Sequence, residues 1–134
     1  DEMAGSGKGS INLHYQMPKG EIANSREDMT FLTQFEDGSN MKLQCFGPAG
    51  MSMKKEPGWC STAYRKRYKR MNVSFNVRKD SEEAVRYITV IYPVKKSADA
   101  PKFDAKFKNK AFDENGLEVE VKVNGKKQSL KYKL

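Results

Sequence analysis

The sequence predicts an all-β protein, an antiparallel β-sandwich of about seven or eight strands. Apolar and polar residues alternate over 11–16, 71–78 and 117–123, and this two-residue period places the apolar side chains on one face of a strand. No segment repeats its apolar residues at the spacing of an amphipathic helix. With 134 residues the chain can bury one core, so we expect residues 1–134 to form a single β-sandwich domain.

The first half of the chain contains three expected strands and a loop. Residues 11–16 form the first strand. Residues 30–35 and 41–45 form the next two, and the Asp37-Gly38-Ser39-Asn40 sequence between them favours a turn, so we expect a hairpin. Residues 47–58 are rich in glycine and proline, which break regular structure, and we expect a long loop there.

The second half contains the strongest alternation, in residues 71–78. Residues 85–92 are β-branched and aromatic with few polar interruptions, which is typical of a central strand covered on both faces. Residues 117–123 and 130–134 flank Asn124-Gly125, a pair that favours a tight reversal. Two segments have no clear pattern: 80–84, which suits a single helical turn, and 102–112.

A cluster of positive charge stands in the middle of the chain. The stretch Tyr64-Arg65-Lys66-Arg67-Tyr68-Lys69-Arg70 holds five cations in seven residues. Residues 41–80 carry ten Lys and Arg against two Asp and Glu, a surplus equal to the net charge of +8 of the whole chain. Such a face attracts polymers of phosphate, sulfate or carboxylate groups. The alternative is a solvated edge that blocks aggregation between strands.

The candidate binding residues are the five cations of this run and its two tyrosines. On a strand, alternation would place Arg65, Arg67 and Lys69 on one face and Lys66 and Arg70 on the other. The aromatic rings beside them could stack on sugar rings or bases, or could cover the core. We leave both roles open for Tyr64 and Tyr68, and we expect Trp59 to pack in the core.

The sequence offers little for catalysis or metal binding. It has no Gly-x-Ser-x-Gly motif and no glycine-rich phosphate loop that precedes a helix. The single histidine, His14, has no carboxylate or second histidine nearby in the sequence, so we expect it to be structural or exposed. We therefore expect no catalytic residue, metal site or cofactor within these 134 residues.

Two further observations concern the compartment and the membrane. Cys45 and Cys60 are the only cysteines, and they either form a disulfide in an oxidising compartment or remain as two small buried thiols. No apolar run approaches the roughly 20 residues that cross a membrane, so we expect no membrane partner. The chain begins with Asp1-Glu2 rather than methionine, and we expect it to be a fragment of a longer protein.

Several short motifs follow one another along the chain. They are Ile11-Asn12-Leu13-His14-Tyr15-Gln16-Met17-Pro18, then Gly58-Trp59 with Ser61 and Tyr64 after it, then 71–77, and then Tyr87-Ile88-Thr89-Val90-Ile91-Tyr92-Pro93. Their order and spacing resemble the C-terminal β-sandwich of the heparinase II/III-like polysaccharide lyases, and most closely the heparinase III type. The resemblance covers residues 1–93, and 94–134 fit as the closing strands.

The resemblance implies a bacterial, periplasmic or secreted lyase with an α/α toroid domain upstream of the sandwich. Such enzymes cleave uronic-acid polysaccharides by β-elimination, in which a base removes the proton next to a neutralised carboxylate. It also implies an acidic, heparan sulfate-like polysaccharide as the partner of the basic run. No residue here matches a catalytic position of the family, so we expect the parent chain to be the lyase and the 134 residues alone to be inactive.

Two other functions stay open on the residues themselves. One is a stand-alone basic β-domain that binds nucleic acid, and the other is a purely structural sandwich. A nucleic-acid binder should interleave aromatic residues with cations so that bases can stack, and only Tyr64 and Tyr68 do so here. We therefore expect nucleic acid not to be the partner.

Overall fold

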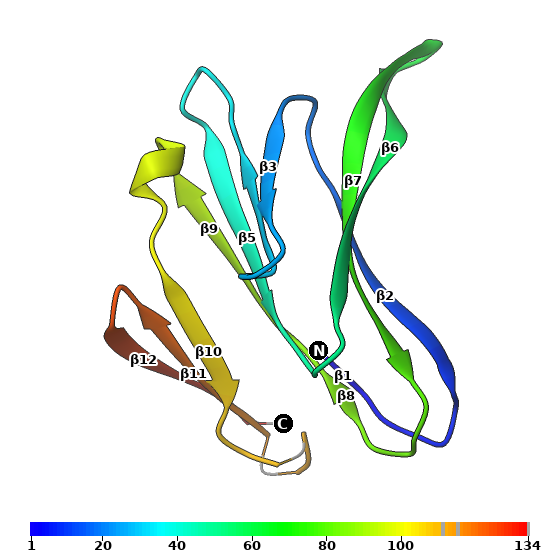
Figure 1. Ribbon diagram of the computed structural model, residues 1–134, viewed down its shortest axis with the longest axis vertical. Helices are drawn as coiled ribbons and strands as arrows, with labels where there is room; N and C mark the ends of the chain where they lie inside the picture. Colours follow the sequence, from blue (N-terminus) through cyan, green and yellow to red (C-terminus); the bar gives the residue numbers. More distant parts are fainter. Residues whose placement is uncertain (111, 115, 134) are drawn as a thin grey trace.

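The computed structural model describes residues 1–110, 112–114 and 116–133. Its regular structure is β throughout this part of the chain, apart from one 3-10 turn, η1 (Ser97–Asp99) (Figure 1). The strands are β1 (Glu2–Met3), β2 (Gly9–Gln16), β3 (Ile22–Ser25), β4 (Thr30–Thr33), β5 (Asn40–Phe46), β6 (Ser52–Ala63), β7 (Lys66–Lys79), β8 (Val85–Arg86), β9 (Ile88–Val94), β10 (Phe103–Phe107), β11 (Leu117–Val123) and β12 (Lys126–Tyr132).

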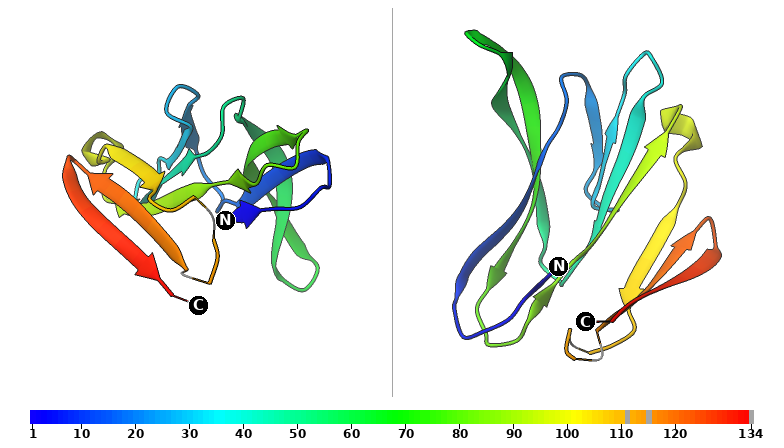
Figure 2. Two further views of the ribbon diagram at one scale, coloured as in Figure 1. Left: turned by 90° about the horizontal axis from the view of Figure 1, so that it is seen from below. Right: turned by 180° about the vertical axis from the view of Figure 1, so that it is seen from behind.

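These strands form three principal sheets and one short ladder, and neighbouring strands are antiparallel in all of them. The sheet orders are β2-β7-β6, β3-β4-β5-β9 and β10-β11-β12, with β1 paired to β8. Figures 1 and 2 show that the three-stranded sheet β10-β11-β12 lies on the far side of the four-stranded sheet from β2, β6 and β7. The prediction of an all-β antiparallel sandwich is confirmed, but the described residues form twelve strands rather than about seven or eight.

The core lies between the β2-β7-β6 sheet and the four-stranded sheet. Phe75 on β7 is fully buried, and its ring lies 5.4 Å from that of Phe31 on β4 and 6.1 Å from that of Tyr15 on β2. Leu43 and Val73 are also fully buried in this cluster. Aromatic pairs at these separations contribute beyond their buried area, so Phe75 links the two layers.

Both predicted reversals are confirmed. β4 pairs with β5 across the Asp37-Gly38-Ser39-Asn40 turn, as expected for a hairpin. Asn124 and Gly125 join β11 to β12 with φ angles of 49° and 79°. A positive φ at both central residues defines the tight turn whose twist matches the strands, and Asn-Gly tolerates it best. Residues 80–84 contain bends and no helical turn, and residues 103–107 of the ambiguous segment form β10.

The prediction of a long loop over 47–58 is wrong, because β6 occupies its second half. Pro57 pairs opposite Met71, and Gly58 pairs opposite Arg70. β6 is the last strand of its sheet, and a proline is tolerated on an edge strand because its missing N–H removes no internal ladder bond. At Gly58 a Cβ atom would lie only 2.3 Å from the Asn72 amide nitrogen, so glycine makes room for that side chain.

The prediction of a central strand over 85–92, covered on both faces, is also wrong. The segment divides at Tyr87, which is fully buried, into β8 and β9. β9 is the outer strand of its sheet, and it pairs only with β5 there. Ile91 is 55% exposed and Tyr92 39% exposed. The apolar composition of 85–92 indicates that this strand is suited to burial. It does not show whether other strands of these 134 residues cover it.

Candidate functional site

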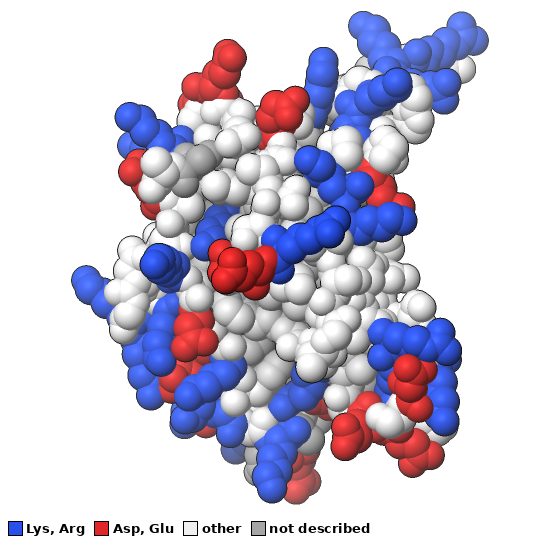
Figure 3. Space-filling model, viewed as in Figure 1, with Lys and Arg blue, Asp and Glu red and all other residues white. Residues whose placement is uncertain are grey.

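The basic run lies at the end of a long hairpin formed by β6 and β7. Ala63 pairs with Lys66, so Tyr64 and Arg65 form the connecting turn, and Arg65 has a φ of 61°. The hairpin extends past the other strands (Figure 1), and its end carries a dense group of Lys and Arg side chains (Figure 3). We call residues 64–70 the basic tip.

The expected division of the cations between two faces is only partly right. Arg67 and Lys69 do share a face, where they lie 4.6 Å and 5.8 Å from the centre of the Trp59 ring. Arg65 does not continue that row, because it stands in the turn, with its guanidinium 5.1 Å from the Tyr64 ring. A hairpin turn inside the run resets the alternation that one continuous strand would have.

The expectation that Trp59 packs in the core is wrong. Its side chain is 53% exposed on β6, opposite Lys69. The hairpin end projects past the other strands, so this part of the hairpin has no second sheet against it. Contact between a cation and an aromatic face is attractive, and the ring therefore holds Arg67 and Lys69 in place. The turn at Tyr64-Arg65 brings Trp59 beside the cations, and 63–66 contain none of the residues that usually favour a turn, so the sequence carries no local signal for it.

The opposite face of the hairpin is less exposed. Tyr68 stands opposite Cys60, and its hydrogen bond with Cys60 is the main cause that raises the pKa of the phenol. Arg70 donates a hydrogen bond to the side-chain amide oxygen of Gln16 on β2. In the turn, Tyr64 is 85% exposed. Of the two tyrosines, Tyr64 is therefore the one available for stacking.

The cations of the basic tip lack acidic partners within the described part of the chain. Eight ion pairs occur there, and none includes Arg65, Lys66, Arg67, Lys69 or Arg70. Charges that are not neutralised internally produce an attractive field for an anion and keep their hydrogen-bond donors available. The basic tip is therefore a cluster of cations that no acidic side chain of the described residues neutralises.

The lysines of the β10-β11-β12 sheet are in a different situation. The carboxylate of Glu120, whose side chain is 4% exposed, lies 2.5 Å from Lys127, 3.6 Å from Lys106 and 3.8 Å from Lys108. Lys131 likewise pairs with Glu118 at 3.5 Å. The hydrogen bond from Lys127, supported by the charges of Lys106 and Lys108, lowers the pKa of Glu120 against the opposing effect of burial. These lysines are partly neutralised where they stand.

Replacement of Glu120 by glutamine should destabilise the protein in a pH-dependent way. Because the folded-state pKa of Glu120 is lowered, the stabilisation is present above the unfolded-state pKa and is lost as the pH falls through the folded-state pKa. Urea unfolding at pH 7 should show a lower free energy of unfolding for Glu120→Gln than for the parent, and the difference should shrink on acidification. The exposed Glu82→Gln variant is the control. If the two proteins differed in their free energy of unfolding by the same amount at pH 7 and at acidic pH, the stabilising role of the Glu120 carboxylate would be contradicted.

The two cysteines are free thiols. Cys45 is buried on β5, where burial raises its pKa and Thr89 donates a hydrogen bond to its sulfur at 3.7 Å. Cys60 is half-buried on β6, in the other layer. The alternative of a disulfide is therefore not realised. His14 is exposed on β2, and the described residues contain no group of three or more side chains that could hold a metal ion.

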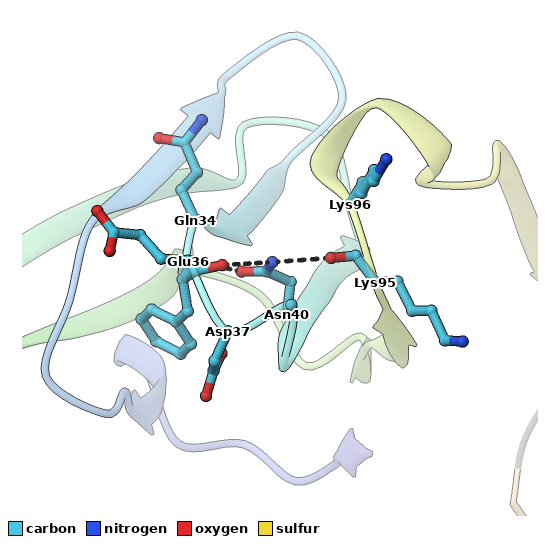
Figure 4. Close-up of a pocket in the computed structure, with 8 residues that line it drawn as sticks. Gln34, Glu36, Asp37, Asn40, Lys95 and Lys96 are labelled. Carbon is cyan, nitrogen blue, oxygen red and sulfur yellow. Dashed lines mark hydrogen bonds between the residues drawn. The ribbon is translucent and has the colours of Figure 1, made fainter.

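A hollow lies beside the turn before β5 (Figure 4). Its main polar group is the Asn40 amide, whose oxygen accepts from the Phe35 N–H at 2.6 Å and whose nitrogen donates to the Lys95 carbonyl at 3.2 Å. Two lysines, Lys95 and Lys96, and two acidic residues, Glu36 and Asp37, are among the residues that line it. This hollow is thus the anchor of a turn and has no excess of either charge.

Comparisons of the sequence and of the structure place the chain among known proteins. No family model matches it. It is 88% identical over its full length to a heparin-sulfate lyase of Bacteroides stercoris and 30% identical over its full length to a heparin-sulfate lyase of Bacteroides thetaiotaomicron. In both cases it spans only 20% of the relative's length. No helix among the described residues is long and apolar enough to cross a membrane.

Solved structures agree with these relatives. A heparinase III gene product matches 99% of the chain with a TM-score of 0.93 and 92% identity, and the match covers 21% of that protein. A crystal structure of heparinase III gives a TM-score of 0.89 at 29% identity, again over 21% of its length. These matches define the class of the chain as an antiparallel β-domain of the kind found in much larger proteins. The chain is similar to the C-terminal part of proteins named heparin-sulfate lyase and heparinase III, which confirms the resemblance in the sequence.

Proposed function

We propose that this chain is the C-terminal β-sandwich module of a heparan sulfate lyase and that its basic tip binds the acidic polysaccharide. β-Elimination is then performed by the rest of the parent chain, in a periplasmic or secreted enzyme with an upstream α/α toroid domain. Support for the parent activity comes from relatives that are named heparin-sulfate lyases and that extend well beyond the matched fifth.

The observation that carries the binding proposal is a projecting cluster of cations without acidic partners in the described part of the chain. Arg65 and Arg67 offer planar forks that suit bidentate contact with sulfate or carboxylate groups. Trp59 lies under Arg67 and Lys69 and limits the freedom of these side chains, so less conformational entropy is lost when they bind. The hairpin presents these donors at its far end, away from the core (Figure 3).

The test is elution from a heparin column under a rising salt gradient. The variant Arg65→Ala/Arg67→Ala/Lys69→Ala removes three charges from the basic tip. Binding to a polyanion releases counterions, and by analogy with nucleic acids each lost contact reduces the salt dependence of log K by about 0.7 to 0.9. The triple variant should therefore elute at clearly lower salt, and the slope of its log K against log salt concentration should be smaller by about 2 to 3.

The chain offers a matched control in Lys126→Ala/Lys127→Ala/Lys131→Ala, which also removes three charges. Lys127 and Lys131 already pair with Glu120 and Glu118, so their loss should change retention less. Circular dichroism should be unchanged for the tip variant, because its residues lie outside the core. Equal shifts for the two triple variants would show that net charge controls retention, and the tip would then be a solvated edge.

The exposure of Trp59 and Tyr64 beside the cations favours one competing function, the binding of single-stranded nucleic acid. Bases stack on aromatic side chains that adjoin a basic groove. Competition for the parent protein between heparan sulfate and a single-stranded oligonucleotide of equal charge separates the two functions. We expect heparan sulfate to compete more strongly, and stronger competition by the oligonucleotide would favour the alternative.

A further inference from the structure

An apolar groove of about 720 Å³ lies between β9 and the β10-β11-β12 sheet. One wall is the continuous segment 87–92, and the other is the apolar face of β11 and β12. On β11 this face carries Leu117, Val119, Val121 and Val123, and it continues on β12 with Leu130 and Tyr132. The strands β9, β11 and β12 that line the groove lie away from the basic tip (Figure 1), so the proposed binding of polysaccharide does not use it.

The large hydrophobic side chains in the groove are unusually exposed. Ile91 is 55% exposed and Tyr92 39% on β9, and Leu130 and Tyr132 are each 61% exposed on β12. These four make up most of the seven large hydrophobic residues that are exposed in the described part of the chain. Scattered hydrophobic residues are normal on a surface, but a contiguous apolar patch marks a surface that meets another one.

The backbone of β9 is also incomplete on this side. β9 is the end strand of the order β3-β4-β5-β9, so one row of its N–H and C=O groups has no ladder partner among the described strands. Exposed edges are normally protected by charged residues, bulges or proline. The edge strand β6 follows this rule with Lys54, Lys55 and Pro57, whereas 88–94 contains no charged residue and is protected only by Pro93.

The relatives provide the occupant. Their matched segment is only 20% of their length, so a protein of this kind has a long polypeptide outside these residues. We propose that an extended segment of that polypeptide pairs with the free edge of β9 and adds a strand to the four-stranded sheet. Its alternate apolar side chains then cover Leu130 and Tyr132. Addition of a strand to an open edge supplies main-chain hydrogen bonds, and the apolar wall selects the side chains.

This inference rests on the proposal that the chain is part of a longer lyase, but it does not depend on the basic tip. It is tested by the rate at which a maleimide labels single cysteines in the complete protein and in the 134-residue chain. Leu130→Cys reports on the groove, and Ser129→Cys reports on the opposite face of the same strand. Both are made in a Cys60→Ser background, because Cys60 is half-buried and Cys45 is buried.

We expect the complete protein to label at Leu130→Cys at least tenfold more slowly than the 134-residue chain does, with little change at Ser129→Cys. Hydrogen exchange of the amides in 88–94 should slow in the complete protein as well, because half of them gain partners. Equal labelling of Leu130→Cys in both proteins would overturn the proposal. Protection in the short chain that increases with its concentration would also overturn it, since the occupant would then be a second copy. Retention on heparin is measured separately, so failure of either proposal is recognised on its own.

Discussion

Replacement of Phe75 by alanine should lower the free energy of unfolding by about 3–5 kcal/mol, because it removes a large buried ring and leaves a cavity. Phe75 is fully buried, and its ring contacts those of Phe31 in the opposite layer and Tyr15 on the neighbouring strand. Phe75 lies on β7, which is paired with β2 on one side and with β6 on the other. These strands cannot easily move into the cavity. The measurement is the midpoint and slope of urea unfolding, followed by circular dichroism.

The matched control for this variant is Trp59→Ala, which removes an even larger aromatic side chain from the same sheet. Trp59 is 53% exposed and lies outside the core cluster, so its loss should cost less than about 1 kcal/mol. A similar loss of stability for both variants would show that the hairpin end is part of the cooperative core. A small loss for Phe75→Ala would contradict the arrangement of the two layers.

The second large effect is expected at Arg86 on β8. Its side chain contacts Glu2 at the beginning of the chain and Phe107 on β10 of the β10-β11-β12 sheet. Its Nε lies 2.7 Å from the Glu2 carboxylate, its Nη1 donates to the Asn109 carbonyl at 2.7 Å, and its guanidinium lies 3.8 Å from the centre of the Phe107 ring. The two paired side chains are only 14% and 16% exposed. Arg86→Met should therefore cost about 3 kcal/mol, the lower end of the range for breaking a buried ion pair.

The control for Arg86→Met is Arg78→Met, because Arg78 and Asp80 form an ion pair with the same 2.7 Å separation. Their side chains are 70% and 64% exposed, and exposed pairs contribute about 0–1 kcal/mol. The double variant Arg86→Met/Glu2→Gln should recover part of the lost stability, since the unpaired carboxylate is then removed. Equal effects of Arg86→Met and Arg78→Met in urea unfolding would contradict the role of burial.

Sequence reasoning located the strands whose signal is local. The alternation in 71–78 and 117–123 predicted β7 and β11, and Asn124-Gly125 predicted the reversal into β12. A strand has a period of two wherever one face is buried, and a turn depends on the φ preferences of two residues. The same reasoning failed at 47–58, because Pro57 is tolerated in β6 through its place at a sheet edge and Gly58 makes room for the Asn72 side chain.

By itself the sequence determined the all-β class, the two hairpin turns and the concentration of positive charge between Arg65 and Arg70. Only the tertiary structure decided which cations are available. It leaves the basic tip without acidic partners in the described chain, brings Trp59 beside Arg67, and gathers three lysines around Glu120. Ion pairs, strand neighbours and burial depend on contacts between residues far apart in the chain. The spacing of neighbouring residues therefore carries no direct signal for them.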